Sequence, residues 1–570
     1  MTTNDSGLGF FGKNSLQEQV WQGDAGSVAF DTAGIRGKLL NSDQACTIVR
    51  DQNRIGMTNG GRLCHPGDGD SGTSMEALLI APPLATQGLG DPAFLTTYNV
   101  KYAYATGSMA NGISGEEMVI ALGQEHILGS FGAGGLLPER IEAAIHRIQR
   151  ALPQGPYAFN LIHSPSEEAL ERQAVEHYLK HGVRVVEASA FLDLTPHVVH
   201  YRAAGLGLNS ANQIEIGNKV IAKVSRREVA TKFLQPAPVK ILRSLLEQNL
   251  ITELQANLAE KVPMADDITV EADSGGHTDN RPLVCLLPSI IALRDDIQER
   301  YRYPEEVRVG AAGGIGTPAS ALGAFMLGAA YVMTGSINQA CVEAGTSQHT
   351  KTLLAQAEMT DVIMAPAADM FELGVKLQVL KRGTLFAMRA LKLFNLYQNC
   401  DSIDEIPPAE REKLERQIFH RNLDAVWEDC VAFFNQRDPD QIRRAANNPK
   451  RKMALIFRWY LGLASRWATL GEKGREMDYQ IWCGPAMGAF NEWVKGTYLA
   501  DPAERRVADV ARHTITGASY LYRIQDLKIQ GLRIPARLAQ YRPTAWETTE
   551  KGPCPIQNLT TEARRAQRTQ

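Results

Sequence analysis

The sequence lacks the features of several protein classes. Its eight cysteines lie far apart and form no CxxC pair, which argues against a zinc or iron–sulfur site and against a disulfide framework. No stretch approaches the roughly 20 apolar residues that a membrane span needs. Residues 1–15 also lack the charged-then-apolar pattern of an export signal. We therefore expect a cytoplasmic protein that is neither exported nor integral to a membrane.

An excess of charge of either sign is absent as well. The 60 basic and 63 acidic side chains give a formal net charge of -3, so the chain as a whole offers no attraction for nucleic acid or another polyanion. Any recognition of phosphate must be local. The apolar share of 44% in 570 residues is enough to bury a large core, which we expect to be divided between two or three packed units.

Short apolar runs alternate with amphipathic helical stretches between about residues 100 and 336, as expected for parallel strands joined by crossover helices. There are eight such runs, and eight strands close a barrel. The sequence therefore predicts an α/β fold, a (β/α)8 TIM barrel with an N-terminal extension and a helical C-terminal domain. The runs are 101–109, 126–134, 157–164, 183–191, 219–226, 267–277, 307–316 and 329–339.

Four regions follow from this pattern. We expect an N-terminal extension of short strands and turns, a barrel with a helical insertion that could border its mouth, a mainly helical domain and a flexible tail. Two segments after the barrel, 374–398 and 502–529, are interpreted as helices. The N-terminal extension spans 1–95, the barrel spans 96–365 with its insertion at about 226–266, the helical domain spans 366–545 and the tail spans 546–570.

Glycines follow the seventh and eighth runs, where barrels of this kind often bind phosphate. Glycine lets backbone N–H groups approach an anion closely, and the N-terminus of the next helix adds a favourable dipole. We therefore predict a phosphate site at Gly313, Gly314, Thr334, Gly335 and Ser336. This site alone does not distinguish a sugar phosphate, pyridoxal phosphate or FMN.

The ends of the other runs favour FMN. Gly107, Ser108 and Met109 end the first run, and their small size lets a flat isoalloxazine ring lie close to the backbone. Asn160 in the third run could bond the polar edge of that ring, and Lys223 in the fifth could stabilise electron density on its reduction. Lys223 is thus a catalytic candidate, although the pattern leaves open a Schiff-base lysine or a lysine at the barrel rim.

The sixth run ends in Ser274-Gly275-Gly276-His277. Its glycine turn would deliver a histidine over the barrel mouth, and imidazole titrates near neutral pH, so His277 is the candidate catalytic acid or base. Ser274, Gly275 and Gly276 are predicted to contact the cofactor. The nearby acids Glu271, Asp273 and Asp279 could orient His277, or could equally be satisfied by backbone donors or by Arg281.

Longer segments resemble a known family. The segments that end runs six to eight, GGH (275–277), AAGGIGTP (311–318) and TGSINQA (334–340), resemble the FMN-dependent nitronate monooxygenase and enoyl reductase superfamily. Seven longer segments are similar to the PfaD family, which includes the trans-acting enoyl reductases of trans-acyltransferase polyketide synthases. These segments are 159–165, 186–196, 222–230, 270–282, 365–384, 453–468 and 478–494.

The resemblance implies an enoyl reductase with FMN as cofactor and NADPH as hydride donor. Its substrate would be an enoyl thioester on an acyl carrier protein domain of a polyketide or fatty acid synthase. His277 would supply a proton to the α-carbon, while Gly313, Gly314, Gly335 and Ser336 would hold the phosphate and Asn160 and Lys223 would contact the flavin ring. The superfamily usually has Glu-Ala before Gly-Gly-His. Here Asp273-Ser274 stands in that place, as in PfaD-type proteins, which favours reduction.

Two other functions remain open at this stage. The same flavin could serve a nitronate-type oxidase or monooxygenase, or the chain could be a scaffold subunit that has lost catalysis. The sequence does not identify the acyl chain, and it leaves open whether the protein forms a homo-oligomer. It gives no reason to expect nucleic acid or membrane as a partner.

Overall fold

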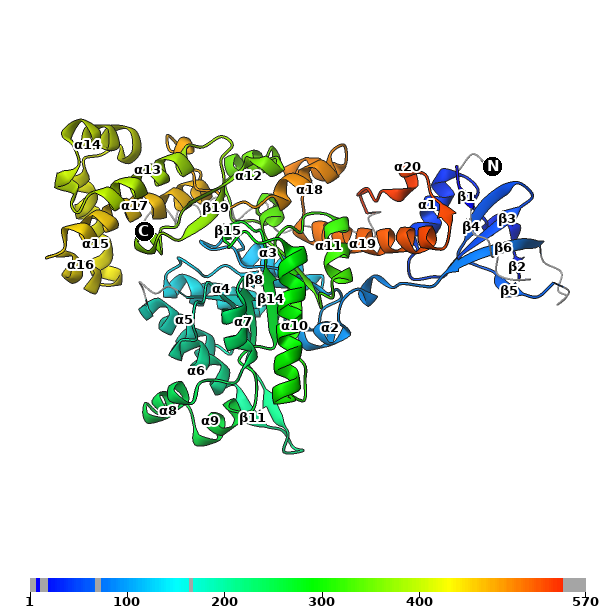
Figure 1. Ribbon diagram of the computed structural model, residues 1–570, viewed down its shortest axis with the longest axis horizontal. Coiled ribbons are helices and arrows are strands. Elements are labelled where there is room, and N and C mark those ends of the chain that lie inside the picture. Colours follow the sequence, from blue (N-terminus) through cyan, green and yellow to red (C-terminus); the bar gives the residue numbers. More distant parts are fainter. Residues whose placement is uncertain (1–6, 11–18, 67–72, 164–167, 547–570) are drawn as a thin grey trace.

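The computed structural model describes residues 7–10, 19–66, 73–163 and 168–546. At its centre a closed barrel of parallel strands follows the order of the chain (Figure 1). Each strand lies within one of the eight apolar runs, which confirms the predicted barrel. The strands are β7 (Tyr104–Thr106), β8 (Leu128–Phe131), β9 (Ala158–Ile162), β10 (Val185–Ser189), β13 (Lys219–Val224), β14 (Asp267–Glu271), β16 (Arg308–Ala312) and β17 (Val332–Thr334).

Amphipathic helices surround this barrel. In α4 the apolar residues Ile141, Ile145 and Ile148 recur at helical spacing and are all buried, so this face packs against the strands. α2 (Pro92–Tyr98) precedes the barrel, and α12 (Gln348–Ala355) follows its last strand. The crossover helices are α3 (Glu116–Gln124), α4 (Pro138–Ala151), α5 (Glu168–Lys180), α6 (Pro196–Ala204), α7 (Arg227–Leu234), α10 (Leu283–Tyr301) and α11 (Pro318–Met326).

The insertion after β13 is helical, with α7 followed by α8 (Val239–Glu247) and α9 (Glu253–Ala259). Gln255 of α9 donates a hydrogen bond of 3.0 Å to the carbonyl of Ala204, at the end of α6. α9 packs beside the hairpin β11 (Leu206–Leu208) and β12 (Ile214–Ile216), which precedes β13 (Figure 1). α8 and α9 therefore lie toward the amino ends of the strands. The expectation that the insertion borders the barrel mouth is therefore wrong for α8 and α9, which pack on α6, whereas α7 directly follows the carboxyl end of β13.

The N-terminal region contains an antiparallel sheet in the order β4-β3-β6-β2-β5. The helix α1 (Thr32–Leu40) and one face of this sheet share a core with the later helix α19 (Val507–Ile529). Leu39 and Ile48 thus pack together with Tyr520 and Ile524. The strands are β2 (Val20–Gly23), β3 (Cys46–Asp51), β4 (Arg54–Thr58), β5 (Arg62–Cys64) and β6 (Thr73–Ala81).

A small sheet joins the barrel to the region after it. β18 (Val362–Pro366) and β19 (Lys376–Leu380) pair antiparallel, and β15 (Gly276–His277) pairs with β19. The sequence predicts one helix over 374–398, but only the second part of this segment is helical, in α13 (Phe386–Asn399). The hydrogen bonds of β19 to two neighbouring strands override its helical tendency, and Gly383 at a φ of 74° separates strand from helix.

The helices after this sheet form a core of their own, at the end of the molecule opposite to the N-terminal sheet (Figure 1). Their apolar side chains pack with Leu377 and Val379 of β19, which attaches them to the small sheet. They are α13, α14 (Pro408–Leu414), α15 (Leu423–Arg437), α16 (Asp440–Ala445) and α17 (Pro449–Leu470).

The chain then returns to the barrel through α18 (Ala486–Val494) and α19. The first half of α19 belongs to the barrel core and its second half to the core of the N-terminal sheet. α20 (Ala536–Ala539) follows β20 (Leu532–Arg533), which pairs with β1 (Gly9–Phe10). Of the predicted tail, 547–570 lies outside the described residues. Among those described, no helix combines the length and apolar character needed to cross a membrane.

Candidate active site

The carboxyl ends of three barrel strands bring Lys223 together with two carboxylates. The Nζ atom of Lys223 lies 3.4 Å from Oε1 of Glu187 and 3.4 Å from Oε1 of Glu271. Glu187 is fully buried, and it also accepts hydrogen bonds of 2.9 Å from the backbone N–H and from the hydroxyl of Ser108. Two predicted site residues, Ser108 and Lys223, are therefore linked through a carboxylate that the sequence interpretation missed.

These carboxylates determine the charge of Lys223. Burial alone would lower the pKa of its ammonium group, but the negative charges of Glu271 and Glu187 outweigh burial and raise that pKa. Lys223 is consequently a fixed cation at neutral pH. A Schiff-base lysine needs a neutral amine, so this environment argues against that interpretation and is consistent with a lysine that stabilises negative charge.

Two glycines at the ends of the seventh and eighth strands border open space. A Cβ atom added at Gly314 or at Gly335 would meet no atom within 4 Å. Their neighbours are packed instead: a Cβ at Gly313 would lie 2.7 Å from the carbonyl carbon of Ala272. Helix α11 begins shortly after this turn, capped by Thr317. The predicted phosphate site is thus a cradle with exposed backbone at a helix N-terminus, which suits an anion.

The loop before α18 lies against this cradle. The N–H group of Gly484 donates a hydrogen bond of 3.0 Å to Oγ of Ser336. A Cβ at Gly275 would lie 2.9 Å from the same Oγ and 2.9 Å from the backbone of Cys483. The structure therefore brings Gly275, Ser336 and the residues 483–484 into contact. Cys483 and Gly484 were missed because they lie almost 150 residues beyond Ser336 in the chain.

His277 is held by an acid from outside the barrel. Its Nε2 atom lies 3.1 Å from Oδ1 of Asp369, which lies between β18 and β19. Burial by itself lowers the pKa of His277, but the charge of Asp369 and the hydrogen bond to it raise the pKa above its usual value. His277 therefore holds its proton more tightly than a free imidazole does. No spacing in the chain indicates Asp369 as its partner.

The three acids proposed from the sequence to orient His277 have other partners. Glu271 accepts from Ser274 at 3.0 Å in addition to its contact with Lys223. Asp273 accepts a hydrogen bond of 2.7 Å from Gln378. Asp279 accepts hydrogen bonds from Ser225 and, through two nitrogens, from Arg226. The acids near His277 in the sequence are thus held by other side chains, and Asp369 takes the place beside the imidazole.

The remaining predicted residues are buried around the barrel interior. Asn160 uses its amide nitrogen to donate to Oγ of Ser189 at 2.8 Å and to the carbonyl of Glu187 at 3.1 Å, which leaves only its oxygen for a ligand. The hydroxyl of Thr334 is bonded to Tyr104 and Asn338, so this side chain is not available to a phosphate. The other two residues have backbone bonds: Gly107 donates to the carbonyl of Thr334 and Met109 to Ser114.

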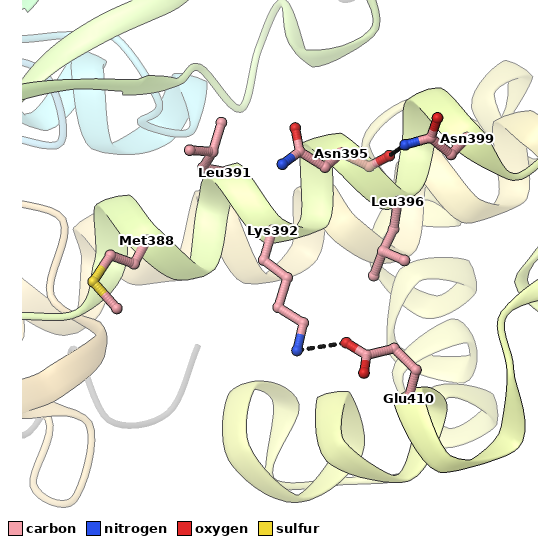
Figure 2. A pocket seen from close by; sticks show the side chains of 7 residues that line it. All are labelled: Met388, Leu391, Lys392, Asn395, Leu396, Asn399 and Glu410. Atoms are coloured by element: carbon pink, nitrogen blue, oxygen red, sulfur yellow. Dashed lines mark hydrogen bonds and ion pairs between the residues drawn. The ribbon is translucent and has the colours of Figure 1, made fainter.

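A separate groove lies on the helical region. It is lined by residues of α13 and by Glu410 of α14, with an ion pair of 2.5 Å between Lys392 and Glu410 along one side (Figure 2). Met388 and Leu391 expose apolar surface to it. No barrel residue lines this groove, so it is distinct from the site at the strand ends.

Comparisons with known proteins agree with this architecture. The family model for nitronate monooxygenase matches residues 94–405. The model for the N-terminal domain of fatty acid synthase subunit PfaD matches residues 21–83, over the N-terminal sheet. The model for the inserted helical domain of acyl-carrier-protein S-malonyltransferase matches residues 400–479, within the helical region.

Individual relatives come from polyketide and polyunsaturated fatty acid synthesis. One polyunsaturated fatty acid synthase subunit of Thraustochytrium sp. is 51% identical over 456 residues, which cover 79% of this chain and 30% of that relative. Polyketide biosynthesis protein PksE of Bacillus subtilis is 45% identical over 439 residues, 77% of this chain and 57% of PksE. The chain thus spans less than two thirds of each of these relatives.

One solved structure is similar to most of this chain. It is the enoyl reductase domain of MlnA, from the macrolactin biosynthesis cluster of Bacillus amyloliquefaciens, with 39% identity and a TM-score of 0.74. The match covers 78% of this chain and 100% of that domain. The chain therefore belongs to the nitronate monooxygenase-like superfamily and, within it, to the PfaD family of synthase-associated enoyl reductases.

Proposed function

We propose that this protein is an FMN-dependent enoyl reductase that acts in trans. It would use NADPH to reduce the α,β double bond of an enoyl thioester carried on an acyl carrier protein, during polyketide or polyunsaturated fatty acid synthesis. The observation that carries the proposal is the pair of His277 and Asp369, 3.1 Å apart, in which His277 follows the glycine turn whose Gly275 lies against Ser336 of the cradle. Family membership supports the choice of flavin and of reaction class.

The chain's own residues fit FMN. The exposed backbone at Gly314 and Gly335 would hold the phosphate, together with the N-terminus of α11. The Lys223 ammonium would stabilise negative charge on the flavin ring and is fixed for that role by Glu187 and Glu271. Bound FMN would supply the relay that passes a hydride from NADPH to the β-carbon of the enoyl thioester.

His277 would complete the reduction. A hydride at the β-carbon leaves an electron pair at the α-carbon, and the protonated imidazole would donate its proton there to form the saturated thioester. Asp369 would stabilise the protonated ring, and the ring would afterwards regain a proton from solvent. An imidazole whose protonated form is stabilised by Asp369 suits this donating role, whereas converting a neutral nitroalkane to its nitronate would need the unprotonated imidazole.

Anaerobic stopped-flow spectroscopy of the FMN-loaded protein tests the proposal. NADPH should bleach the flavin absorbance, and an enoyl thioester on a carrier protein should restore it. His277→Ala should slow the second step at least about 100-fold while flavin reduction by NADPH stays nearly unchanged. Equal reoxidation rates for His277→Ala and the unchanged protein would remove His277 from the proton-donor role.

The same experiment separates the two competing functions. Rapid flavin reduction by an alkyl nitronate, with no response to the enoyl thioester, would identify an oxidase instead. A protein that shows no bound-flavin spectrum after incubation with FMN would be the non-catalytic scaffold. Either result would contradict the proposed enoyl reductase.

A further inference from the structure

Two neighbouring helices bring two imidazoles and a carboxylate together on the outer surface of the barrel. Glu142 and His146 belong to α4, and His181 directly follows α5 (Figure 1). Each of the three side chains can offer one ligand atom, and these atoms all lie within 4.8 Å of one another. Nε2 of His181 already lies 2.8 Å from Oε1 of Glu142. The rings of His146 and His181 stand nearly perpendicular, with their centroids 4.8 Å apart.

The local structure holds this cluster in place. Glu142 and His146 are four residues apart in one helix, so their side chains project from the same face. The backbone of His181 is fixed by a hydrogen bond of 2.8 Å from the side chain of Gln149, on the same helix α4. Gly182, at a φ of 64°, then ends the turn that follows α5. Two of the candidate ligands therefore come from helix α4, and the third from a turn that is hydrogen-bonded to this helix.

We propose that Glu142, His146 and His181 bind a divalent first-row transition metal ion of the Zn²⁺ class. Imidazole nitrogen and carboxylate oxygen are ligands that this class prefers, and three protein ligands leave one tetrahedral position for water. Neighbouring ligand atoms in such a site lie about 3.3 Å apart, as Zn–N distances near 2.0 Å require. The pair His181 and Glu142 is already closer than that, and the exposed side chain of His146 can move to close the remaining gap.

Lys180 opposes the binding of a cation at this site. Its Nζ atom lies 3.0 Å from Oε1 of Glu142, and its side chain is 65% exposed. A bound metal ion would displace this ammonium group, which can turn into solvent at little cost. Removing its charge should therefore strengthen metal binding, whereas removing a ligand should weaken it.

The location of the cluster indicates what a bound ion would do. α5 carries the chain from the carboxyl end of β9 back toward the amino end of β10, so His181 lies away from the strand ends that form the candidate active site. A metal ion there would fasten α4 to α5 and stabilise the barrel. This inference does not depend on the proposed enoyl reductase activity.

Titration of Zn²⁺ into the full chain, with any purification tag removed and metal stripped by a chelator, tests the site. Competition with a chromophoric zinc indicator should show one ion bound per chain. His146→Ala and Glu142→Gln should each weaken binding at least about 10-fold, and Lys180→Ala should strengthen it. Zn²⁺ should also raise the thermal midpoint of the unchanged protein and of Lys180→Ala, but not that of His146→Ala.

A matched control is available on the next helices. His197 of α6 pairs with Glu168 of α5 at 3.3 Å, and among the described residues this pair belongs to no three-ligand group, so His197→Ala should leave zinc affinity unchanged. The free thiols of Cys64, Cys285 and Cys400 are not buried and could bind zinc on their own. Binding that persists in both His146→Ala and Glu142→Gln, or a complete lack of binding by the unchanged protein, would overturn the proposal.

Discussion

Lys223 lies between two carboxylates, one of which is completely buried. Lys223→Met should destabilise the protein by about 3 kcal/mol, because Glu187 would keep a buried charge without its cation. Chemical denaturation of the FMN-free protein would measure this loss. The double variant Lys223→Met with Glu187→Gln removes both charges and should recover part of it. If the loss of unfolding free energy in the double variant equals the sum of the losses in the two single variants, the two residues are not coupled.

Asp369 should control the proton on His277. Asp369→Asn removes the charge that raises the pKa of the imidazole. The rate of flavin reoxidation by the enoyl thioester should fall as the pH rises and His277 loses its proton. In Asp369→Asn this fall should therefore occur at lower pH. Flavin reduction by NADPH provides the control, since it does not need the proton. A profile that does not move would rule out a positioning role for Asp369.

The same pair should contribute to stability in a defined pH range. The pKa of His277 is raised on folding, so its contribution is complete below the unfolded value of about 6.5 and is lost as the pH rises through the folded pKa. The pKa of Asp369 is lowered, so its contribution is lost only in strong acid. The difference in unfolding free energy between the unchanged protein and Asp369→Asn should thus be larger at pH 5.5 than at pH 9. Both side chains are about 30% exposed, which limits the difference to about 1 kcal/mol or less.

Residues such as Lys223 and His277 could be selected from the sequence because they end apolar runs of a recognisable barrel. Asp369 could not, since it lies 92 residues beyond His277 and no periodic pattern connects the two. Glu187 lies within an apolar run, where an acid indicates a buried partner, but the sequence does not show that the partner is Lys223. Pairings between elements are determined by the packing of the whole chain, and sequence spacing does not reveal them.

At the scale of elements, a substitution in the turn after β17 should weaken FMN binding while the protein still folds. Gly335→Ala adds a methyl group where no atom lies within 4 Å, although the φ of -131° and ψ of -75° at this residue lie outside the α and β regions. The FMN-free protein should therefore stay folded with a loss of about 1–3 kcal/mol, while FMN affinity should fall at least about 10-fold because the methyl group occupies the cradle. Fluorescence titration of FMN would measure the change.

The control for this variant is Gly323→Ala on the exposed face of α11, where an added Cβ also meets nothing within 4 Å. It should raise stability slightly, because alanine favours a helix, and should leave FMN affinity unchanged. Equal FMN affinities for Gly335→Ala and Gly323→Ala would show that the cradle does not hold the phosphate.

The barrel strands were predictable as elements because buried parallel strands are continuous apolar runs and recur in a fixed alternation with helices. The small sheet β15-β19-β18 could not be predicted from the sequence. β15 has only two residues, and its pairing with β19 joins residues about 100 positions apart. A short apolar run such as 376–380 fits a strand or a helix equally well until its hydrogen-bonding partners are known.

At the scale of the whole molecule, Arg523 of α19 connects the N-terminal region to the rest. Its buried guanidinium donates to backbone carbonyls, including those of Asn41 at 2.8 Å, Ser42 at 3.0 Å and Gln44 at 2.6 Å. Arg523→Met should destabilise the protein by about 3 kcal/mol, because these carbonyls would lose their donor. Thermal and chemical denaturation would measure this loss of unfolding free energy. Arg523→Lys should recover part of it. A midpoint unchanged in Arg523→Met would show that the N-terminal sheet is held by apolar contacts alone.

The pairing of β1 with β20 has a consequence for the longer relatives. Gly9 lies opposite Arg533 in this two-stranded sheet, so the first described strand is hydrogen-bonded to a strand that follows α19. The chain then continues through α20 to Trp546, whose ring stacks on His513 of α19 at 4.5 Å. A domain added before β1 in a longer relative would therefore be anchored beside the end of α19.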